Sequence, residues 1–326
     1  MKAVLLTAPG GAEQLYLGAY PTPEPGPDEL LVRVAATALN RADLMQREGR
    51  YPPPKGASEI LGLELAGTVE AMGAACEGWD VGDRVFGLLP GGGYAEYAVL
   101  HHQMAMPVPP AMSFEEAAAV PEVFLTAFQA LYWLGGLEEE QHVLIHAGAS
   151  GVGTAAIQLA KRASAHAYAT ASAPKHRRCL EMGADLVIDY KEDDFAERIQ
   201  EVTSGYGVDI IVDFIGASYF KQNISSLAVD GRLIILSMLG GRMVESVDLG
   251  ALFRKRAQVI TTTLRSRSLA YKIDLTKAFS KKWLSFFESG HLVPVIDSVY
   301  DWADVQDAHR HMGANKNAGK IVLRVG

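Results

Sequence analysis

The segment from Val143 to Lys161, VLIHAGASGVGTAAIQLAK, decides the fold. Its first part, Val143–Ile145, is a short apolar run typical of a buried parallel strand. A glycine-rich turn (147–153) follows, and the Ala, Leu and Ile content of Thr154–Ala163 predicts a helix. A strand, a turn and a helix in this order place backbone N–H groups and a helix N-terminus where a pyrophosphate can bind. Loops of this composition often only reverse the chain, but the flanking strand and helix favour a dinucleotide site.

The segment after the next expected strand indicates which dinucleotide binds. NAD-binding chains usually carry an acidic residue at the end of the second strand, about 20 residues beyond the glycine turn, to hold the ribose 2′-OH. Here the expected strand Ala167–Thr170 is followed by ASAPKHRR, with no carboxylate before Glu181. Hydroxyl and cationic side chains suit a 2′-phosphate, so the sequence predicts NADPH with Lys175 as a phosphate contact. Arg177 and Arg178 are at least as well explained as a solvated helix face.

Composition sets the outer bounds. The chain has 326 residues, of which 49% are hydrophobic and 21% charged, and its formal net charge is −8. It is long enough for two domains with a large core. No dense basic tract is present, so neither a nucleic acid nor an anionic membrane is expected as a partner.

Targeting and redox signals point to a cytoplasmic protein. The N-terminal segment breaks at Pro9, too early for a secretory signal. The most apolar window, 117–136, contains Pro121 and Glu122, so we expect a helix within the fold and no membrane span. Cys76 and Cys179 form neither a metal spacing nor a disulfide framework.

The amino-acid composition and the hydrophobic pattern of the chain change near residue 118. Residues 1–117 are rich in Gly, Pro and short strand-like runs, which indicates a compact β-rich domain. From 118 to 265 apolar strands alternate with helical segments, which predicts an α/β fold with a doubly wound parallel sheet of the Rossmann type. Residues 266–326 form a helix-rich tail that closes on a strand, Lys320–Arg324. The expected strands of the parallel sheet are Val143–His146, Ala167–Thr170, Leu186–Asp189, Ile210–Asp213, Leu233–Ser237 and Val259–Thr262.

A family resemblance extends along nearly the whole chain. It is carried by the runs ALNRADLMQREGRYPPP, ILGLELAG, LLPGGGYAEYA, LTAFQAL, LIHAGASGVGTAAIQLA, LRSRS and ANKNAGKIVL. On these runs the chain resembles the medium-chain dehydrogenase/reductase superfamily, in its zinc-free quinone oxidoreductase branch and closest to the p53-inducible type. The resemblance implies a GroES-like catalytic domain built from 1–117 and 266–326, an NADPH-binding Rossmann domain at 118–265, and an active site in the cleft between them.

The motifs of the zinc-dependent members are missing. Those members carry a Cys early in the first domain and a His in a GHE motif, whereas this chain reads NRAD at Asn40–Asp43 and Gly-Leu-Glu at 62–64. Leu63 cannot bind a metal, and a catalytic zinc needs about three N, S or O ligands. His101 and His102 are adjacent, and adjacent residues of a strand point to opposite faces, so we expect a surface loop or a strand end for this pair. We therefore expect no metal.

The chemistry follows from that expectation. Without a Lewis acid, hydride addition to an acceptor that is already electron-poor is favoured, with the protein supplying alignment and a proton. The resemblance implies an NADPH-dependent quinone oxidoreductase. Two alternatives stay open: an NADPH-dependent enone or enoyl reductase, and a weakly catalytic NADPH-binding protein that acts as a redox sensor.

Two residues are candidates for a catalytic role. Tyr51 lies in the loop GRYPPP, which its prolines stiffen, and a phenol can donate to a developing oxyanion. A tyrosine that only packs against prolines explains the same sequence equally well. Asn40 resembles the residue that lines the nicotinamide and substrate pocket, although an Asn in a turn also satisfies backbone groups. Asp43 is expected to organise that loop by accepting backbone N–H groups.

The resemblance also assigns the cofactor contacts. It implies pyrophosphate binding by Ser150 and the turn's N–H groups, 2′-phosphate binding by Ser172 and Lys175, and a threonine, Thr126, near the nicotinamide ribose. Ordinary core packing for Tyr190 and capping of helix carbonyls for Thr126 are the alternatives. Several of the remaining positions follow the carboxyl ends of strands, where open α/β sheets bind ligands. The full set is Asn40, Thr126, Gly148, Ser150, Gly151, Val152, Ser172, Lys175, Tyr190, Phe214, Gly216, Leu239, Gly240, Leu264 and Asn315.

The sixth expected strand, Val259–Thr262, ends the sheet. An open edge of β-branched residues invites pairing with a second copy. The sequence therefore predicts a homodimer with a continuous sheet, and the resemblance implies the same.

Overall fold

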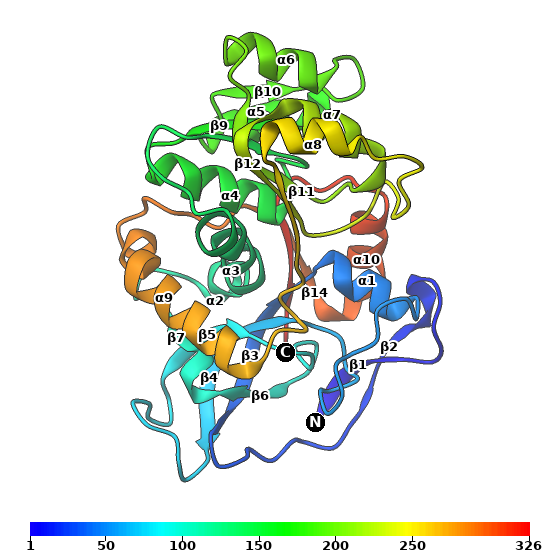
Figure 1. The fold of residues 1–326 in the computed structure, drawn as a ribbon. Helices are drawn as coiled ribbons and strands as arrows, with labels where there is room; N and C mark the ends of the chain where they lie inside the picture. Colours follow the sequence, from blue (N-terminus) through cyan, green and yellow to red (C-terminus); the bar gives the residue numbers. More distant parts are fainter. The chain divides into compact units, whose positions relative to one another are not determined.

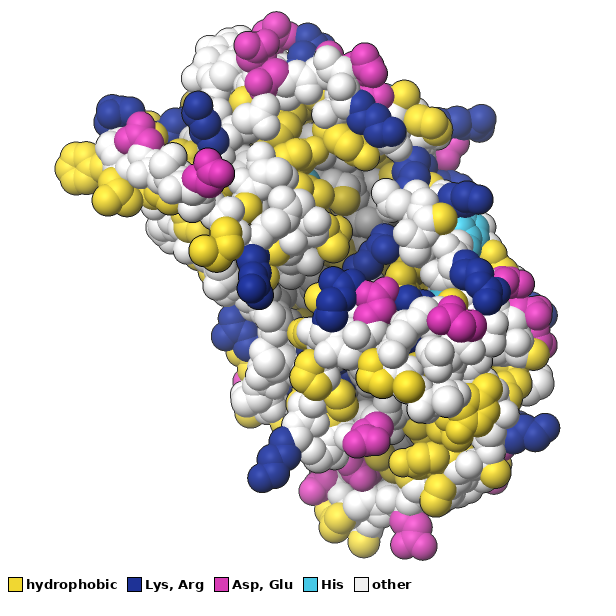
Figure 2. Space-filling model, turned by 90° about the vertical axis from the view of Figure 1, so that its right-hand side faces the viewer, with side chains coloured by type: hydrophobic (Ala, Val, Ile, Leu, Met, Phe, Trp, Pro, Cys, Tyr) yellow, Lys and Arg dark blue, Asp and Glu magenta, His cyan; other side chains and the backbone are white.

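The computed structural model describes residues 1–326 and divides them into two compact units. Unit 1 combines Met1–Leu125 with Arg265–Gly326, and unit 2 is the continuous segment Thr126–Leu264. No helix in either unit is long and apolar enough to cross a membrane. Lys and Arg side chains are interspersed with Asp and Glu on the face drawn in Figure 2.

Unit 2 is built on a six-stranded sheet in the order β10-β9-β8-β11-β12-β13, and every neighbouring pair is parallel. The expected doubly wound parallel sheet is therefore confirmed. Apolar side chains alternate out of the strands into a buried core that includes Leu144, Phe195, Ile211 and Leu233. The strands are β8 (His142–Ile145), β9 (His166–Thr170), β10 (Leu186–Ile188), β11 (Val208–Asp213), β12 (Leu227–Ile235) and β13 (Gln258–Thr261).

Strand β12 begins at Leu227, six residues before the expected start at Leu233. The reason is an irregularity in its pairing with β11: Val208 faces Leu227, but Ile210 faces Arg232. Asp230 takes a left-handed conformation (φ 67) within this stretch, which lets the strand continue past the extra residues. A sequence pattern of period two does not reveal such a bulge.

Helices of unit 2 group around the sheet (Figure 1). Helix α4 packs with α5, whereas α6, α7 and α8 pack in sequence on one another. Local capping explains where two of them begin: Ser150 caps α4, and Asp194 accepts from the N–H groups of Ala196 and Glu197 at the start of α6. The helices are α4 (Gly151–Arg162), α5 (His176–Glu181), α6 (Phe195–Val202), α7 (Phe220–Ser226) and α8 (Leu249–Lys255), with a π-helix at Gln129–Leu134 and 3₁₀ turns at Ala173–Lys175 and Ala217–Tyr219.

Unit 1 holds a seven-stranded sheet with the path β14-β15-β3-β4-β5-β7, in which β6 also pairs with β3. Strands β1 and β2 form a separate antiparallel pair. The last strand of the chain, β15, runs antiparallel to β3, so that Val322 faces Ala38. The strands are β1 (Lys2–Leu6), β2 (Leu15–Ala19), β3 (Glu29–Ala38), β4 (Glu64–Met72), β5 (Arg84–Leu88), β6 (Tyr97–His101), β7 (Ala105–Pro107), β14 (Ile296–Asp301) and β15 (Lys320–Arg324).

The helices of unit 1 come from both of its segments. A buried aromatic group joins them, because Phe124 packs against Phe279 and Phe287 at 6.3 Å and 4.9 Å between ring centroids. These helices are α1 (Arg41–Arg47), α2 (Phe114–Ala118), α9 (Leu269–Glu288) and α10 (Val305–Gly313), with α3 (Pro121–Phe128) running on into unit 2 and 3₁₀ turns at Ala12–Gln14, His102–Met104 and Trp302–Asp304.

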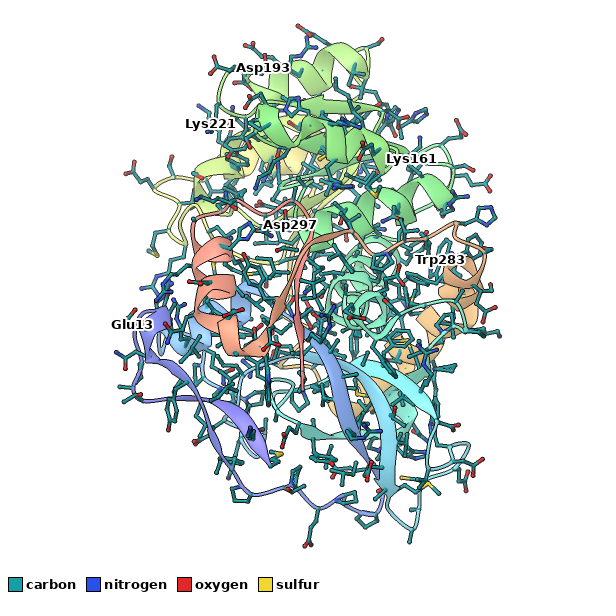
Figure 3. The ribbon with its side chains drawn as sticks, turned by 180° about the vertical axis from the view of Figure 1, so that it is seen from behind. Glu13, Lys161, Asp193, Lys221, Trp283 and Asp297 are labelled. Atoms are coloured by element: carbon teal, nitrogen blue, oxygen red, sulfur yellow. The ribbon has the colours of Figure 1, made fainter.

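One feature of unit 1 differs from the expectations. The tail contains a strand, β14, that the helix-rich reading omitted; Asp297 on β14 (labelled in Figure 3) accepts from the N–H of Ala318 at 2.7 Å and lies 3.4 Å from Nε2 of His311. His101 and His102 lie at a strand end, as expected. His101 ends β6 and His102 begins a 3₁₀ turn, so the two rings stack with centroids 5.2 Å apart.

Candidate active site

The glycine turn between β8 and α4 presents free donors at the start of a helix. Ser150 caps α4 by accepting from the N–H of Gly153 at 3.0 Å, and the first helical bond runs from the N–H of Thr154 to the carbonyl of Ser150 at 2.9 Å. The N–H groups of Gly151 and Val152 come before that bond, as expected for the first turn of a helix. They are the backbone donors available for an anion at this turn.

Two glycines of the turn are required by packing. The N–H of Gly148 donates to the carbonyl of Thr170 at 2.9 Å, so it is used inside the fold. A Cβ on Gly148 would lie 2.6 Å from the Cβ of Ala169, and a Cβ on Gly153 would lie 2.4 Å from the carbonyl oxygen of Ala147. The turn therefore packs this tightly only with glycine at both positions.

The loop after β9 contains Ser172 and Lys175 in one 3₁₀ turn, closed by a bond from the N–H of Lys175 to the carbonyl of Ser172 at 2.8 Å. Both residues are half-buried, and the Ser172 hydroxyl does not cap the turn. A carboxylate reaches this loop from β10, which the sequence reasoning missed. Asp189 accepts from the N–H groups of Ala173 at 3.1 Å and Lys191 at 3.0 Å, so its oxygens hold backbone.

A buried polar network joins the carboxyl ends of β8, β9 and β11. The imidazole of His146 bonds to Thr170 Oγ1 at 3.0 Å and to Asn223 Oδ1 at 2.7 Å, and Asn223 Nδ2 donates to Asp213 at 3.2 Å. Desolvation lowers the pKa of His146 to about 4 and raises the pKa of Asp213 to about 6, the latter opposed by N–H donors from Ile215 and Gly216. This network fixes the strand ends on which the predicted cofactor loops begin.

Four predicted residues come together above β11 and β12. The N–H of Leu239 donates to the carbonyl of Phe214 at 3.0 Å, and the N–H of Gly240 donates to that of Ile215 at 2.7 Å. Gly216 donates its N–H to Asp213 at 3.1 Å. The loops that follow the two strands therefore form one layer.

The other predicted residues of unit 2 differ in exposure. Tyr190 follows β10, is 39% exposed and lies close enough to Tyr219 to influence its titration, so it is not an ordinary core residue. Leu264 is buried. Thr126 is buried as well, and its Oγ1 has no hydrogen-bond partner. The expected alternative for Thr126, capping of helix carbonyls, is therefore absent.

Unit 1 contains a buried ion pair with Asn40 between its partners. Nζ of Lys320 lies 2.7 Å from Oε1 of Glu64, and these side chains are 3% and 0% exposed. The same Nζ donates to Asn40 Oδ1 at 2.7 Å, and Asn40 Nδ2 donates to Glu64 Oε1 at 2.8 Å. The other oxygen of Glu64 accepts from the N–H of Glu122 at 2.8 Å. Both ends of the Asn40 amide are therefore engaged within the cluster.

Asp43 organises the surrounding loop, as expected. It accepts from the N–H of Asn40 at 2.7 Å and from the N–H of Gly62 at 3.1 Å. Desolvation raises the pKa of Asp43 to about 6, and desolvation together with the charge of Glu64 raises the pKa of Glu122 to about 8. The Glu122 carboxyl is therefore largely protonated at neutral pH.

Tyr51 lies beside an arginine that the sequence reasoning did not single out. The guanidinium carbon of Arg265 is 5.3 Å from the centroid of the Tyr51 ring. Asn315 lies elsewhere in unit 1: it is exposed, follows α10 and has φ 55, and its N–H donates to the carbonyl of Met312 at 3.0 Å. An Asn in this conformation ends a helix well.

The side chains do not offer a metal site. Nowhere do three or more His, Cys, Asp or Glu residues come together in a way that could hold an ion. Leu63 is buried, and its neighbour Glu64 is neutralised by Lys320. The positive charge beside the Glu64 carboxylate is thus the ammonium group of Lys320.

Comparisons with known proteins match both units. A family model described as an alcohol dehydrogenase GroES-like domain matches residues 26–110, and one described as a zinc-binding dehydrogenase matches 182–323. The human synaptic vesicle membrane protein VAT-1 homolog is 33% identical over 99% of this chain and 86% of its own length. A mycocerosic acid synthase-like polyketide synthase of Mycobacterium tuberculosis is 33% identical over 98% of this chain but only 15% of its own length.

Solved structures share the fold along the whole chain. A mycobacterial quinone oxidoreductase superposes with a TM-score of 0.86, 31% identity and 99% coverage of both chains, and a mycobacterial protein complexed with NADPH gives 0.86, 32% and 99%. A structure described as an NAD-dependent alcohol dehydrogenase gives 0.88 at 33% identity, covering 100% of both chains. An enoyl reductase gives 0.87 at 28% identity, covering 100% of this chain and 99% of that one.

Proposed function

Because the chain belongs to the medium-chain dehydrogenase/reductase superfamily, we propose that it is an NADPH-dependent quinone oxidoreductase that works without a metal. The observation that carries the proposal is the glycine turn, with free N–H groups at the start of α4 and no acidic side chain at the end of β9. The fold shared with a quinone oxidoreductase and with an NADPH complex supports it.

The residues of unit 2 fit such a cofactor. The N–H groups of Gly151 and Val152 would bind the pyrophosphate, and Ser172 and Lys175 would bind the 2′-phosphate. The orphaned hydroxyl of Thr126 would gain a partner in the nicotinamide ribose. When bound, NADPH supplies a hydride from its nicotinamide ring. We propose that the loops carrying Tyr190, Phe214, Gly216, Leu239, Gly240 and Leu264 line the rest of the cofactor.

In unit 1 the phenol of Tyr51 would donate a hydrogen bond to the acceptor oxygen as negative charge collects there. Asn40 has a different role in this proposal. Both ends of its amide are hydrogen-bonded to Lys320 and Glu64, so Asn40 holds these two side chains in place and does not bind the acceptor. The reduction consumes NADPH, a quinone and one proton and yields NADP⁺ and a hydroquinone.

A zinc ion does not fit this chain. Of the carboxylates at the positions of the zinc motif, Glu64 is already paired with Lys320 at 2.7 Å and Asp43 accepts two backbone N–H groups, and Leu63 offers no ligand atom. The proposed reaction therefore involves no metal. Incubation of the purified protein with 1,10-phenanthroline should leave its activity unchanged, and loss of activity that added zinc restores would contradict this.

The first test is NADPH and NADH oxidation at 340 nm with 1,4-benzoquinone, an ortho-quinone and an enone. NADPH should be oxidised much faster than NADH with quinones. Lys175→Ala removes one charge-assisted contact worth about 1.5–3 kcal/mol, which predicts a Kd for NADPH about 10- to 100-fold higher. The Kd for NADH should stay the same. The matched control is Arg177→Ala, whose side chain is 90% exposed and pairs with Glu181; equal losses in both variants would contradict the assignment.

A second candidate function has its own support. Similarity to an enoyl reductase and to a polyketide synthase favours reduction of an activated C=C bond. A trans-2-enoyl thioester reduced with a higher kcat/KM than any quinone would establish this alternative. If the protein binds NADPH but neither a quinone nor an enoyl thioester oxidises it, both candidate functions are excluded.

We also propose that the protein forms a homodimer through β13. This strand is the edge of the sheet, and Val259 on it is 40% exposed. An unpaired edge of this kind can extend the sheet into a second copy.

A further inference from the structure

Arg265 is a buried cation without a counter-ion. Its side chain is 7% exposed, and no carboxylate lies within ion-pair distance of it. Burial lowers the pKa of Arg265, which Asp43, Tyr51 and Glu122 partly offset, but a guanidinium stays charged in proteins. A buried charge that lacks a partner is costly, so its retention calls for an explanation.

Two of the three nitrogens are held in place. Nε and Nη2 donate to the carbonyl of Pro90 at 3.0 Å and 2.8 Å, and Nη2 also donates to Gln46 Oε1 at 2.7 Å. Gln46 is itself fixed, because its Nε2 donates to the carbonyl of Glu59 at 3.1 Å. The guanidinium plane therefore cannot turn without losing bonds that already exist.

The third nitrogen, Nη1, is buried and has no hydrogen-bond partner. The guanidinium carbon lies over the ring of Tyr51, whose loop is flanked by Gly49 and Gly56 in left-handed conformations. Lys272 is half-buried and close enough to Arg265 for the charge of Arg265 to lower the pKa of Lys272. Nη1 is therefore a buried cationic donor that no acceptor of the protein satisfies.

We propose that Arg265 binds the acceptor oxygen through Nη1, together with the phenol of Tyr51. This deepens the proposed function, on which it rests. The oxygen gains negative charge when the hydride adds to the acceptor, and a guanidinium donor stabilises that charge before water delivers the proton. The preferred acceptors are then carbonyl compounds whose reduced oxygen holds a localised negative charge. Because Nη1 is buried in this structure, the oxygen can reach it only if a neighbouring side chain moves.

The kinetic test compares Arg265→Gln and Arg265→Lys with the wild type over a series of substituted quinones. Loss of one oxyanion donor lowers kcat by about 10²- to 10³-fold. We expect the loss in Arg265→Gln to grow with the basicity of the product oxygen, and the Kd for NADPH to stay unchanged. A merely structural defect would lower kcat/KM for every acceptor by the same factor, and that result would overturn the proposal, as would unchanged kcat/KM. Arg33→Lys, an exposed arginine of β3, is the control.

A binding test separates this inference from the proposed function. 4-Nitrophenolate mimics the anionic product, and its absorbance reports binding without turnover. The wild type should bind it at least tenfold more tightly than Arg265→Gln, and equal affinities would overturn the inference. If the wild type binds 4-nitrophenolate through Arg265 but reduces no quinone, the proposed function fails and the anion site stands. Arg265→Lys keeps the charge and serves if Arg265→Gln does not fold.

Discussion

Replacement of Lys320 by Met should destabilise unit 1 strongly. The change removes the donor of three bonds, to the carbonyl of Leu39 at 2.8 Å, to Asn40 Oδ1 at 2.7 Å and to Glu64 Oε1 at 2.7 Å. Glu64 stays fully buried and keeps only the donors Asn40 Nδ2 and the N–H of Glu122. Breaking a buried pair on one side costs about 3–5 kcal/mol, because the remaining charge is left uncompensated.

Urea unfolding followed by tryptophan fluorescence measures this loss. Three of the four tryptophans, Trp79, Trp283 and Trp302, lie in unit 1, so the signal reports mainly on that unit. The matched control is Arg33→Met, which breaks the exposed pair with Glu70 and should cost about 1 kcal/mol or less.

The double variant Lys320→Met/Glu64→Leu tests the cause. It removes both charges, so its loss should be smaller than that of Lys320→Met alone. A loss in Lys320→Met as small as that of the Arg33 control would refute the reasoning. So would a double variant that is less stable than Lys320→Met.

Three further predictions concern unit 2. Gly153→Ala should weaken NADPH binding at least tenfold in a fluorescence titration, because its Cβ would lie 2.4 Å from a carbonyl oxygen, whereas Gly313→Ala, with its nearest neighbour at 3.9 Å, should not. Because the pKa of Asp213 is raised to about 6, the folded protein holds a proton that the unfolded chain has lost, and Asp213 therefore lowers the free energy of unfolding as the pH rises from 4 to 6. The pKa of His146 is lowered to about 4, so His146 raises the free energy of unfolding over the same range. Asp213→Asn should therefore gain stability relative to the wild type between pH 4 and pH 7 in thermal melts, and a constant difference would contradict this. Val259→Lys at the β13 edge should convert a dimer to a monomer in sedimentation velocity, and a monomeric wild type would remove the dimer proposal.

The parallel sheet could be predicted because its signals are local. The apolar run of β8, the glycine turn and Ser150 before α4 lie within one short stretch, and each predicts its own element. The bulge at Asp230 and the strand β14 were missed, since a left-handed residue and a half-buried strand leave no clear period in the sequence.

The polar cluster of unit 1 could not be predicted in the same way. Asn40 was found by resemblance, but its partners Glu64 and Lys320 lie 24 and 280 positions away. Lys320 looks like an ordinary residue of a closing strand, and only the pairing of β15 with β3 buries it. Arg265 belonged to the run LRSRS, yet its free Nη1 depends on contacts with Pro90 and Gln46, which are remote in sequence.

The pairing of β15 with β3 also sets an order for synthesis on the ribosome. Glu64 is translated 256 residues before Lys320, the cation that neutralises it, so the first segment of unit 1 must wait until Lys320 has been translated. Unit 2 is continuous and can fold while that segment is still incomplete. A nascent chain halted near residue 300 would therefore hold a folded unit 2 and an unfinished unit 1, which exposes the N-terminal strands to chaperones and proteases until Lys320 has been translated.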